Sequence, residues 1–458
     1  MVPRRRPRWC RGSSPPGPQT PLFLLGGVCL SLLSLLLRAW QSGFGVASFV
    51  VGNASASHRR RLLHRTSGRT GRRVEPEFVL RAGVELTASG EWLEFLPAAL
   101  GLAAAGSAAS ALKAKVDGPA GFELEPGALR GRMVVVTGAS SGLGLETAVR
   151  LARAGAVVVA TARTVAKAAA TQAALRTAAA SAAVHCLVLD LADLASVRAF
   201  VDELRRQPYG RRLDVLVNNA GVMAVPEFQT TKDGFEMQLG VNHLGHFALT
   251  GLLIPLLLRA EGYARVISVS SLAHRLGDEG EIWKGFSVSP RSRGAYSAWP
   301  AYNLSKLANV IFARELDRRF REAGVEATAV SLHPGICPTG LARYAVAGED
   351  KPMDDIYADW PLPVQAVMQA LKGTLRPVDR GANSHVYLAA GADGGYMCSG
   401  GLYFEDMRPA DAHDAASDEA LGRRLWEESE RSTGVHFDFA APAEAAAPAA
   451  AVGVASGA

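Results

Sequence analysis

The chain has 458 residues, of which 48% are hydrophobic and 20% charged, which excludes a wholly disordered chain and is typical of a globular protein. The formal net charge of +6 comes from residues 1–74, which hold 13 arginines and no Lys, Asp or Glu. The rest is acidic, so the basic total does not indicate nucleic-acid binding. The five cysteines form no CxxC pair, and neither a metal site nor a disulfide framework is expected.

The N-terminus is predicted to be a targeting extension. The apolar run 22–37 suits a signal-peptide core, and small residues at 46–48 offer a cleavage point, so residues 1–48 are predicted to be a signal peptide. Residues 49–74 are rich in Arg, Ser and Thr without acids, which is typical of a transit peptide. This bipartite leader resembles those of algae with complex plastids and implies plastid import. A signal anchor in the ER membrane is the alternative.

Two further segments are predicted to lie outside the folded domain. Residues 75–125 form a predicted linker, whose Ala-rich stretch 95–112 is long enough to span a membrane but poor in Leu, Ile and Val. That composition favours a linker or surface helix. The Ala- and Pro-rich tail 438–458 is predicted to be disordered.

A nucleotide-binding pattern begins at residue 132. The β-branched run 133–136 predicts a buried strand, and it leads into the glycine-rich turn TGASSGLG at 137–144. A helix is predicted over 145–153 and a second strand over 156–160. Glycines in such a turn let the backbone approach a pyrophosphate, and the helix N-terminus offers free N–H groups. The strand, turn and helix together make this motif specific.

The alternation of strands and helices continues along the chain. Further strands are predicted over 184–189, 213–217, 265–269 and 327–332. This order predicts an α/β fold of Rossmann type, a doubly wound parallel sheet in a single domain over residues 126–437. Polar and glycine motifs follow the strands, at the carboxyl ends where such sheets bind ligands.

The motifs occur in the order found in the short-chain dehydrogenase/reductase family. They are the glycine turn, Asn218-Asn219-Ala220-Gly221, Ser271, the YxxxK stretch 302–306 and Pro334-Gly335. The segments 241–247, 270–274 and 305–309 resemble its retinol-dehydrogenase-like branch. The resemblance implies an oxidoreductase that interconverts an alcohol and a carbonyl on a lipophilic small molecule. It also implies a catalytic tetrad, whose members are Asn242, Ser271, Tyr302 and Lys306.

The tetrad side chains have the chemistry this reaction needs. Tyr302 and Lys306 are four residues apart on a predicted helix and share one face. A neighbouring ammonium is expected to lower the phenol pKa from about 10, so that Tyr302 can exchange a proton with the substrate oxygen. Ser271 is expected to bond the same oxygen. Residues 275–300 are predicted to be a loop near the pocket.

The end of the second strand determines the expected cofactor. NAD-selective sites usually carry an acid there, whereas this chain has Arg163, which can pair with a 2′-phosphate, so NADP(H) is predicted. Asp190 and Leu191 are expected to flank the adenine. Asn218 is expected to close over the ribose, and Thr339 is expected to contact the nicotinamide amide. The complete predicted cofactor site is Gly138, Ser140, Ser141, Gly142, Leu143, Gly144, Arg163, Asp190, Leu191, Asn218, Ala220, Gly221, Tyr302, Lys306, Pro334, Gly335 and Thr339.

Two alternatives stay open at this point. Protochlorophyllide reduction uses a similar glycine turn and YxxxK pair, and an NADP-sensing subunit of a membrane complex would keep the same cofactor motifs. The substrate loop is expected over residues 340–375. Membrane association and a homo-oligomer are both compatible with the sequence. Three histidines, His243, His246 and His333, lack metal-ligand neighbours and are interpreted as packing or hydrogen-bonding residues.

Overall fold

The computed structural model describes residues 110, 113–181, 183–286, 294–342, 365, 373–391 and 399–440. The predicted signal peptide and transit segment lie outside these residues. So do most of the predicted linker, most of the predicted substrate loop and the tail from residue 441.

An eight-stranded sheet forms the centre of the domain, in the order β3-β2-β1-β4-β5-β6-β7-β8. Neighbouring strands from β3 to β7 pair in parallel, and β8 pairs antiparallel with β7. The chain runs outward from β1 to β3 and returns to β4, so the doubly wound Rossmann fold is confirmed. The strands are β1 (Met133–Val136), β2 (Val157–Ala162), β3 (Val184–Val188), β4 (Val215–Asn218), β5 (Ala264–Val269), β6 (Ala327–His333), β7 (Tyr403–Glu405) and β8 (Arg408–Ala410).

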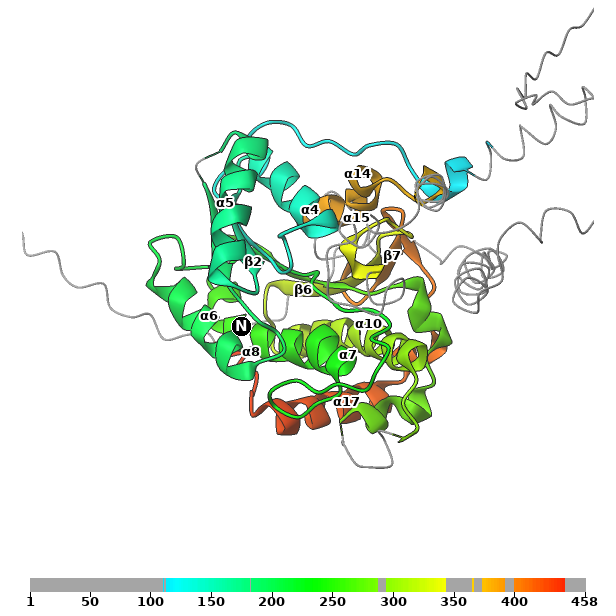
Figure 1. The fold of residues 1–458 in the computed structure, drawn as a ribbon. Coiled ribbons are helices and arrows are strands. Elements are labelled where there is room, and N and C mark those ends of the chain that lie inside the picture. The colour runs from blue at the N-terminus through cyan, green and yellow to red at the C-terminus, as the bar shows by residue number, and fades with distance from the viewer. Residues whose placement is uncertain are drawn as a thin grey trace, which may run out of the picture. The chain divides into compact units, whose positions relative to one another are not determined.

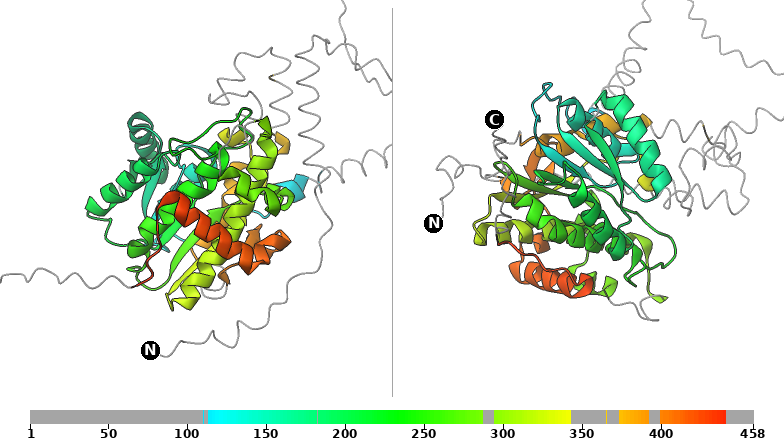
Figure 2. Two further views of the ribbon diagram at one scale, coloured as in Figure 1. Left: turned by 90° about the horizontal axis from the view of Figure 1, so that it is seen from below. Right: turned by 90° about the vertical axis from the view of Figure 1, so that its left-hand side faces the viewer.

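Helices cover both faces of the sheet (Figure 1). One layer contains α4 (Gly142–Arg153), α5 (Val165–Ala179), α14 (Val378–Gly381) and α15 (Asn383–Ala389). The other contains α6 (Leu194–Arg206), α8 (Gly245–Leu257), α10 (Ala298–Glu322) and α17 (Glu419–Thr433), and α17 crosses the outer side of α10 (Figure 2). Short helical turns complete this list: α7 (Met237–Leu239), η3 (Gly240–Leu244), η4 (Leu272–Leu276), η5 (Glu279–Gly285), η6 (Gly340–Ala342) and η7 (Asp414–Ser417).

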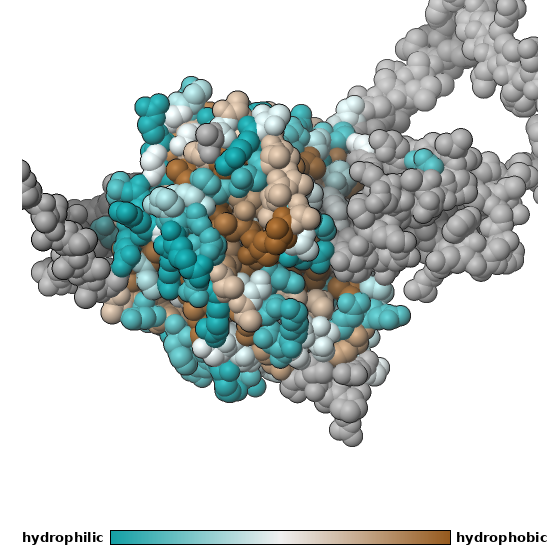
Figure 3. All heavy atoms as spheres, turned by 60° about the vertical axis from the view of Figure 1, so that its left-hand side comes forward, coloured by the Kyte–Doolittle hydropathy of each residue, from teal (hydrophilic) through white to brown (hydrophobic). Residues whose placement is uncertain are grey.

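Strand β1, at the centre of the sheet, shows why the parallel strands carry apolar residues at every position and not only at every second one. Val134 and Val136 face the core under α4 and α5, while Met133 and Val135 face the core under α6 and α8. Because both faces of a parallel sheet are covered, every residue of such a strand is buried. The edge strand β3 is different, since Val188 is exposed. The view toward the α5 and α6 side shows a mostly hydrophilic surface around a compact apolar area (Figure 3).

The helical run Met237–Leu257, which joins α7, η3 and α8, is apolar enough to cross a membrane by length and composition. It is the one such helix among the described residues, and most of it is buried inside the domain. Its apolar composition is therefore explained by its position between the sheet and α17.

The predicted domain boundaries at 126 and 437 need correction at both ends. Phe122 and Leu124, in the predicted linker, pack against the core, and Arg150 of α4 donates to the Phe122 carbonyl. At the other end, Phe439 packs edge-on against Phe320, with ring centroids 5.6 Å apart. These aromatic residues bury apolar surface, so the domain extends beyond the region that the motifs mark.

Candidate active site

The glycine-rich turn joins β1 to α4. Gly138 and Gly142 have φ values of +64° and +57°, in the left-handed region that favours glycine. A Cβ at Gly138 would lie 2.8 Å from Ala220 Cα, so the turn packs directly on the loop after β4. Ser141 precedes α4 but its side chain does not cap the helix. The exposed Ser140 and Ser141 hydroxyls and the free N–H groups of α4 thus fit a dinucleotide phosphate.

Two residues outside the predicted site hold this turn against the β4 loop. The Thr137 hydroxyl accepts the main-chain N–H groups of Asn219 (2.8 Å) and Ala220 (2.9 Å). In return, the Asn219 side chain donates to the Thr137 carbonyl at 2.8 Å. The signal in the sequence was the threonine before the first glycine, together with the second asparagine of the Asn-Asn-Ala-Gly motif.

The adenosine side of the predicted site lies at the ends of β2, β3 and β4. Arg163 directly follows β2 and is exposed. Asp190 follows β3 and accepts the Ala192 N–H at 3.0 Å, and Leu191 is buried beside it. The Asn218 side chain is also buried and donates to Thr250 of α8 at 3.0 Å. The Asn218 side-chain amide group is thus used in a bond to α8, and the expected contact of Asn218 with a ribose stays a prediction.

The nicotinamide side of the predicted site lies at the end of β6. Gly335 has a φ of +87°. A Cβ at Gly142 would lie 3.1 Å from Thr339 Cγ2, so the loop carrying Pro334, Gly335 and Thr339 lies against the glycine turn. Gly221 connects this region to the tetrad, because a Cβ there would lie 3.5 Å from the Lys306 Nζ. The predicted cofactor residues thus lie together at the carboxyl ends of the strands, where folds of this type bind dinucleotides, and their binding of a cofactor stays a prediction.

The structure brings Ser271, Tyr302 and Lys306 together. Tyr302 and Lys306, on α10, are 3% and 2% exposed. Lys306 Nζ lies 5.7 Å from the centroid of the Tyr302 ring and donates to the Val269 carbonyl at 3.0 Å. Ser271 follows β5, and its side chain is a hydrogen-bond partner of the Tyr302 hydroxyl. The Ser270 hydroxyl donates to the Lys306 carbonyl at 2.7 Å, which fixes the end of β5 to α10.

Asn242, the fourth tetrad residue, lies in the π-helical turn η3. Its side chain exchanges two hydrogen bonds with the main chain of Val222 (2.8 and 2.9 Å) and donates to the Ser305 hydroxyl at 2.9 Å. Ser305 in turn donates to the Tyr302 carbonyl at 2.8 Å. The Asn242 side chain is therefore fully used in holding the β4 loop and α10 together. π-helical turns inside helices are frequent at functional sites.

His246 connects Asn242 to the glycine turn. Its Nδ1 lies 3.0 Å from the Asn242 carbonyl, which can only accept, so Nδ1 carries the proton. Its Nε2 lies 2.9 Å from the Thr137 hydroxyl and accepts from it. Burial lowers the pKa of His246 to about 4 and that of His243 to about 3, so both rings are neutral near pH 7. This agrees with the structural role predicted for them.

The expected direction of the Tyr302 pKa is wrong. Burial raises the pKa of Tyr302 to about 12, and the hydrogen bond with Ser271 offsets only part of this rise. Burial also lowers the pKa of Lys306 to about 8. Desolvation disfavours the charged form of each group, and it dominates because both side chains are buried. The phenol is therefore protonated in this state, which suits a proton donor to a carbonyl oxygen.

The predicted loop 275–300 is largely helical where it is described. The turns η4 and η5 occupy 272–276 and 279–285, and α10 begins at Ala298. Trp299, in the first turn of α10, is 39% exposed and meets the Tyr302 ring edge-on, with centroids 6.1 Å apart. Leu276 and Ile336, which follow Ser271 and Gly335 in the sequence, are also exposed. Of these exposed apolar side chains, Trp299 contacts the tetrad directly.

Comparison with known proteins gives consistent matches. A family model described as short chain dehydrogenase matches residues 132–283. Retinol dehydrogenase 13 of Homo sapiens is 36% identical over 306 residues, covering 67% of this chain and 85% of that protein. Retinol dehydrogenase 14 of Homo sapiens is 38% identical over 327 residues, covering 68% and 89%. Polyprenol dehydrogenase of Mus musculus is 38% identical over 312 residues, covering 66% and 84%.

One solved structure, of an uncharacterized protein from Mycobacterium Paratuberculosis, is 34% identical with a TM-score of 0.50, covering 69% of this chain and 99% of that chain. The fold of the family binds a nicotinamide cofactor, and the glycine turn and the adjoining β6 loop carry the residues expected to hold it. The region that the family model matches contains the glycine turn, Asn242 and Ser271. The chain therefore belongs to the short-chain dehydrogenase/reductase family, in its retinol-dehydrogenase-like branch, and is an oxidoreductase acting on CH–OH groups.

Proposed function

We propose that the protein interconverts an alcohol and a carbonyl on a lipophilic small molecule, with NADP(H) as the cofactor. The assembled tetrad is the observation that carries this proposal. Tyr302 is buried and protonated, Ser271 bonds its hydroxyl, and Lys306 lies on the same face of α10. This arrangement suits proton transfer to a carbonyl oxygen that both hydroxyls can reach.

In the reducing direction, Ser271 and Tyr302 would hydrogen-bond the carbonyl oxygen and orient its carbon. A nicotinamide held by the glycine turn, Lys306 and the Pro334–Gly335 loop would supply the hydride for the new C–H bond. Tyr302 then donates its proton to the oxygen, which leaves a phenolate and an alcohol. The ammonium of Lys306 stabilises that phenolate, because opposite charges attract strongly where water is excluded. The oxidation of an alcohol follows the same path in reverse.

The preference for NADP(H) is supported by Arg163. It stands directly after β2 at the place where NAD-selective sites carry an acid, and it is exposed. A 2′-phosphate, like other phosphate monoesters, carries a charge of roughly −1.5 to −2 near neutral pH. Arg163→Ala is therefore expected to weaken NADPH binding roughly tenfold to a hundredfold. NADH binding should hardly change, and an equal loss for both cofactors would contradict this role for Arg163.

The lipophilic substrate is supported by two observations. The relatives carry the names retinol dehydrogenase and polyprenol dehydrogenase, both of which denote long apolar alcohols. In this chain, Trp299 stands beside Tyr302 with part of its ring exposed, and Leu276 and Ile336 add exposed apolar surface. A protein retaining residues 75–458 can be tested with retinal, a polyprenal and a short aliphatic aldehyde, scored by NADPH oxidation. Faster turnover of the short aldehyde than of both long ones would contradict the proposal.

Two further measurements distinguish the proposed enzyme from the two alternatives. Light-dependent turnover of protochlorophyllide would favour a protochlorophyllide reductase. Stable co-purification with a membrane complex, without turnover of any carbonyl, would favour an NADP-sensing subunit. The intact tetrad supports the enzyme, because a sensor needs the cofactor site but not Ser271 and Tyr302 as a proton-transferring pair.

We also propose that residues 1–74 are a plastid address and not part of the enzyme. Their signal-like core and acid-free, Arg-rich continuation support this proposal. A fluorescent protein fused behind residues 1–74 should accumulate in plastids in an alga with complex plastids, and deletion of residues 49–74 should stop it in the secretory pathway. Retention of the full fusion on the ER membrane would favour the signal anchor.

A further inference from the structure

Arg376 is a buried cation beside the loop that carries Pro334 and Gly335, and the proposed reaction does not use it. It is 7% exposed, and it lies just before α14, far in sequence from every motif discussed above. A buried guanidinium is costly unless its donors are satisfied, so its partners indicate what it holds in place.

The partners of Arg376 come from three separate segments. Its Nη1 donates to the Pro334 carbonyl (3.2 Å) and to Asp406 Oδ1 (2.6 Å). Its Nε donates to the Val116 carbonyl at 2.9 Å. Its main-chain N–H donates to the Ile336 carbonyl at 2.9 Å. One side chain thus ties the loop after β6 to residues near both ends of the domain.

Two glycines leave the space that the guanidinium occupies. A Cβ at Gly335 would overlap the Arg376 side chain, and one at Gly118 would lie 2.7 Å from its Nη2. Both glycines have positive φ, +87° and +70°, which other residues rarely adopt. The loop after β6 and the segment around Gly118 are therefore shaped around Arg376.

Residues 113–124, which include the Val116 carbonyl that Arg376 bonds, are here called the strap. Beyond its bond to Arg376, it is bound at its end: the Phe122 N–H donates to Asn383 of α15 (3.2 Å), and the Phe122 carbonyl accepts from Arg150 of α4. The Phe122 and Tyr387 rings meet edge-on, 5.3 Å apart. The strap therefore connects α4, which follows the glycine turn, with the loop that carries Pro334 and Gly335.

We propose that Arg376 is a positioning residue for cofactor binding, which fixes the Pro334–Gly335 loop and anchors it to the strap. The glycine turn and the β6 loop, which lie against each other at Gly142 and Thr339, must keep their relative position for a dinucleotide to bind. Arg is suited to this because its planar, rigid fork bonds several acceptors in a fixed geometry. The inference rests on the nicotinamide cofactor of the family and needs neither a particular carbonyl substrate nor the preference for NADP(H).

The first experiment compares two arginines that both contact the strap. Arg376→Gln should raise the Kd for NADPH roughly tenfold, the value of a lost charge-assisted bond, with kcat at saturating NADPH changed less than about twofold. Arg380 is the control, since it pairs with Asp117 of the strap at 3.4 Å and has no bond to the β6 loop among the described residues. Arg380→Gln should leave the Kd within about twofold of the wild-type value. Equal Kd values for Arg376→Gln and the wild type would overturn the proposal.

The second experiment remains informative if Arg376→Gln does not fold. Gly118→Ala places a methyl group against the guanidinium, whereas Gly121→Ala in the same strap meets nothing closer than 4.0 Å. Gly118→Ala should raise the Kd for NADPH several-fold, and Gly121→Ala should not. Binding is measured by titration of intrinsic fluorescence, next to a thermal melt of each variant. Equal Kd values for both alanine variants would overturn the coupling to the strap. The Kd values of both experiments need no carbonyl substrate, so an incorrect substrate assignment would leave them intact.

Discussion

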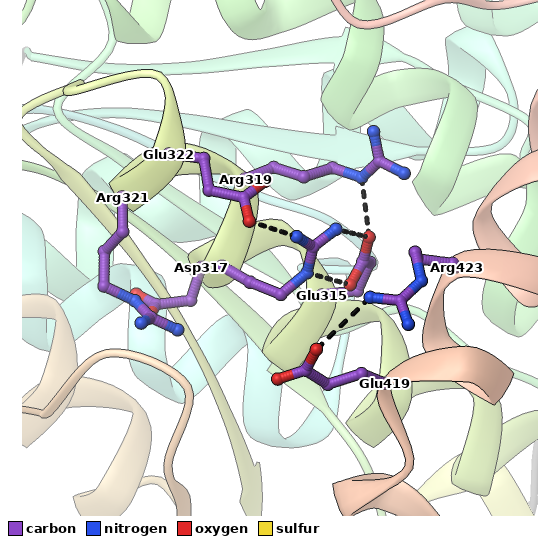
Figure 4. Close-up of polar contacts among 8 residues, drawn as sticks. Glu315, Asp317, Arg319, Arg321, Glu322, Glu419 and Arg423 are labelled. Carbon is purple, nitrogen blue, oxygen red and sulfur yellow. Dashed lines mark hydrogen bonds and ion pairs between the residues drawn. The ribbon is translucent and has the colours of Figure 1, made fainter.

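Helix α10 carries ionisable side chains along its whole length, but its two halves bury them in different ways. The first half holds Tyr302 and Lys306, and none of the described carboxylates pairs with Lys306, which donates to the Val269 carbonyl. The second half holds Glu315, which accepts three bonds from Arg318 and Arg319 at 2.6–2.8 Å (Figure 4). The same helix thus contains an unpaired cation and a saturated ion-pair cluster.

The ion-pair cluster joins α10 to its neighbours. The Arg319 guanidinium lies 4.2 Å from the ring centroid of Trp426 on α17. Asp317, which is buried, accepts from Arg321 at 3.0 Å and from the Ala329 N–H of β6 at 3.3 Å. Charge-assisted bonds and cation–π contacts of this kind stabilise the packing of α17 and β6 on α10.

The contrast shows how one helix separates catalysis from stability. Without a counter-ion, burial lowers the pKa of Lys306 to about 8 and raises that of Tyr302 to about 12. Such shifts are typical of active sites, and they cost folding free energy, because the charged form of Lys306 is poorly solvated. In the second half, Glu315 and Asp317 pair with arginines, so these side chains stay charged and stabilise the fold.

The largest effect is expected for Tyr302→Phe. It removes the proton donor alone and is expected to lower kcat by roughly a thousandfold, within the range of about 10²–10⁴ known for general acid–base catalysis. The Kd for NADPH and the melting temperature should stay close to the wild-type values, because the ring still fills its site. Steady-state kinetics and a thermal melt test this. Turnover similar to the wild type would contradict the mechanism.

The reciprocal change is Glu315→Gln in the second half. It removes the carboxylate between Arg318 and Arg319, whose side chains are 17% and 26% exposed. Breaking a fully buried pair costs about 3–5 kcal/mol, and the exposure of the arginines reduces the expected loss to about 2–3 kcal/mol. Urea denaturation measures this loss, and kcat/KM at 20 °C should change less than about twofold. A large loss of activity in a stably folded variant would show that the halves are coupled.

The pH dependence should follow Lys306. Below its pKa of about 8 the ammonium is present, so kcat/KM for carbonyl reduction should be level there and fall as pH rises through about 8. The free energy of unfolding should rise over the same range and up to about 10.4, because the unfolded chain still binds the proton that the folded protein has lost. Lys306→Met should abolish this rise. An unchanged rise in that variant would assign it to another group.

The smallest effect is expected for Glu419→Gln at the edge of the cluster. Glu419 pairs with Arg423 on α17 at 3.2 Å, and the two side chains are 69% and 47% exposed. Exposed i, i+4 pairs contribute about 0.3–0.5 kcal/mol, so the unfolding free energy should fall by no more than that. Urea denaturation beside Glu315→Gln provides the comparison. A loss above about 1 kcal/mol would mean that the cluster acts as one network.

Sequence patterns alone predict the strands β1 to β6, the glycine turn and the tetrad. Their signals are local: apolar runs mark strands, and glycine and polar motifs follow directly after them. Parallel strands end at one edge of the sheet, so motifs that are far apart, such as the glycine turn and Ser271, meet without further information. This is why the sequence predicts that the tetrad residues are neighbours. Their cofactor contacts stay predictions.

The tertiary structure alone decided the direction of the Tyr302 pKa, the strands β7 and β8, the strap and the role of Arg376. The pKa depends on how completely Tyr302 is buried and on where the Lys306 ammonium points, and neither is a property of the YxxxK spacing. β7 and β8 have three residues each, too few for a periodic signal. Arg376 and Val116 are 260 residues apart, and a single buried guanidinium has no sequence pattern that reveals its acceptors. Long-range contacts of this kind become visible only when the chain is folded, because they depend on which surfaces the packed elements bring together.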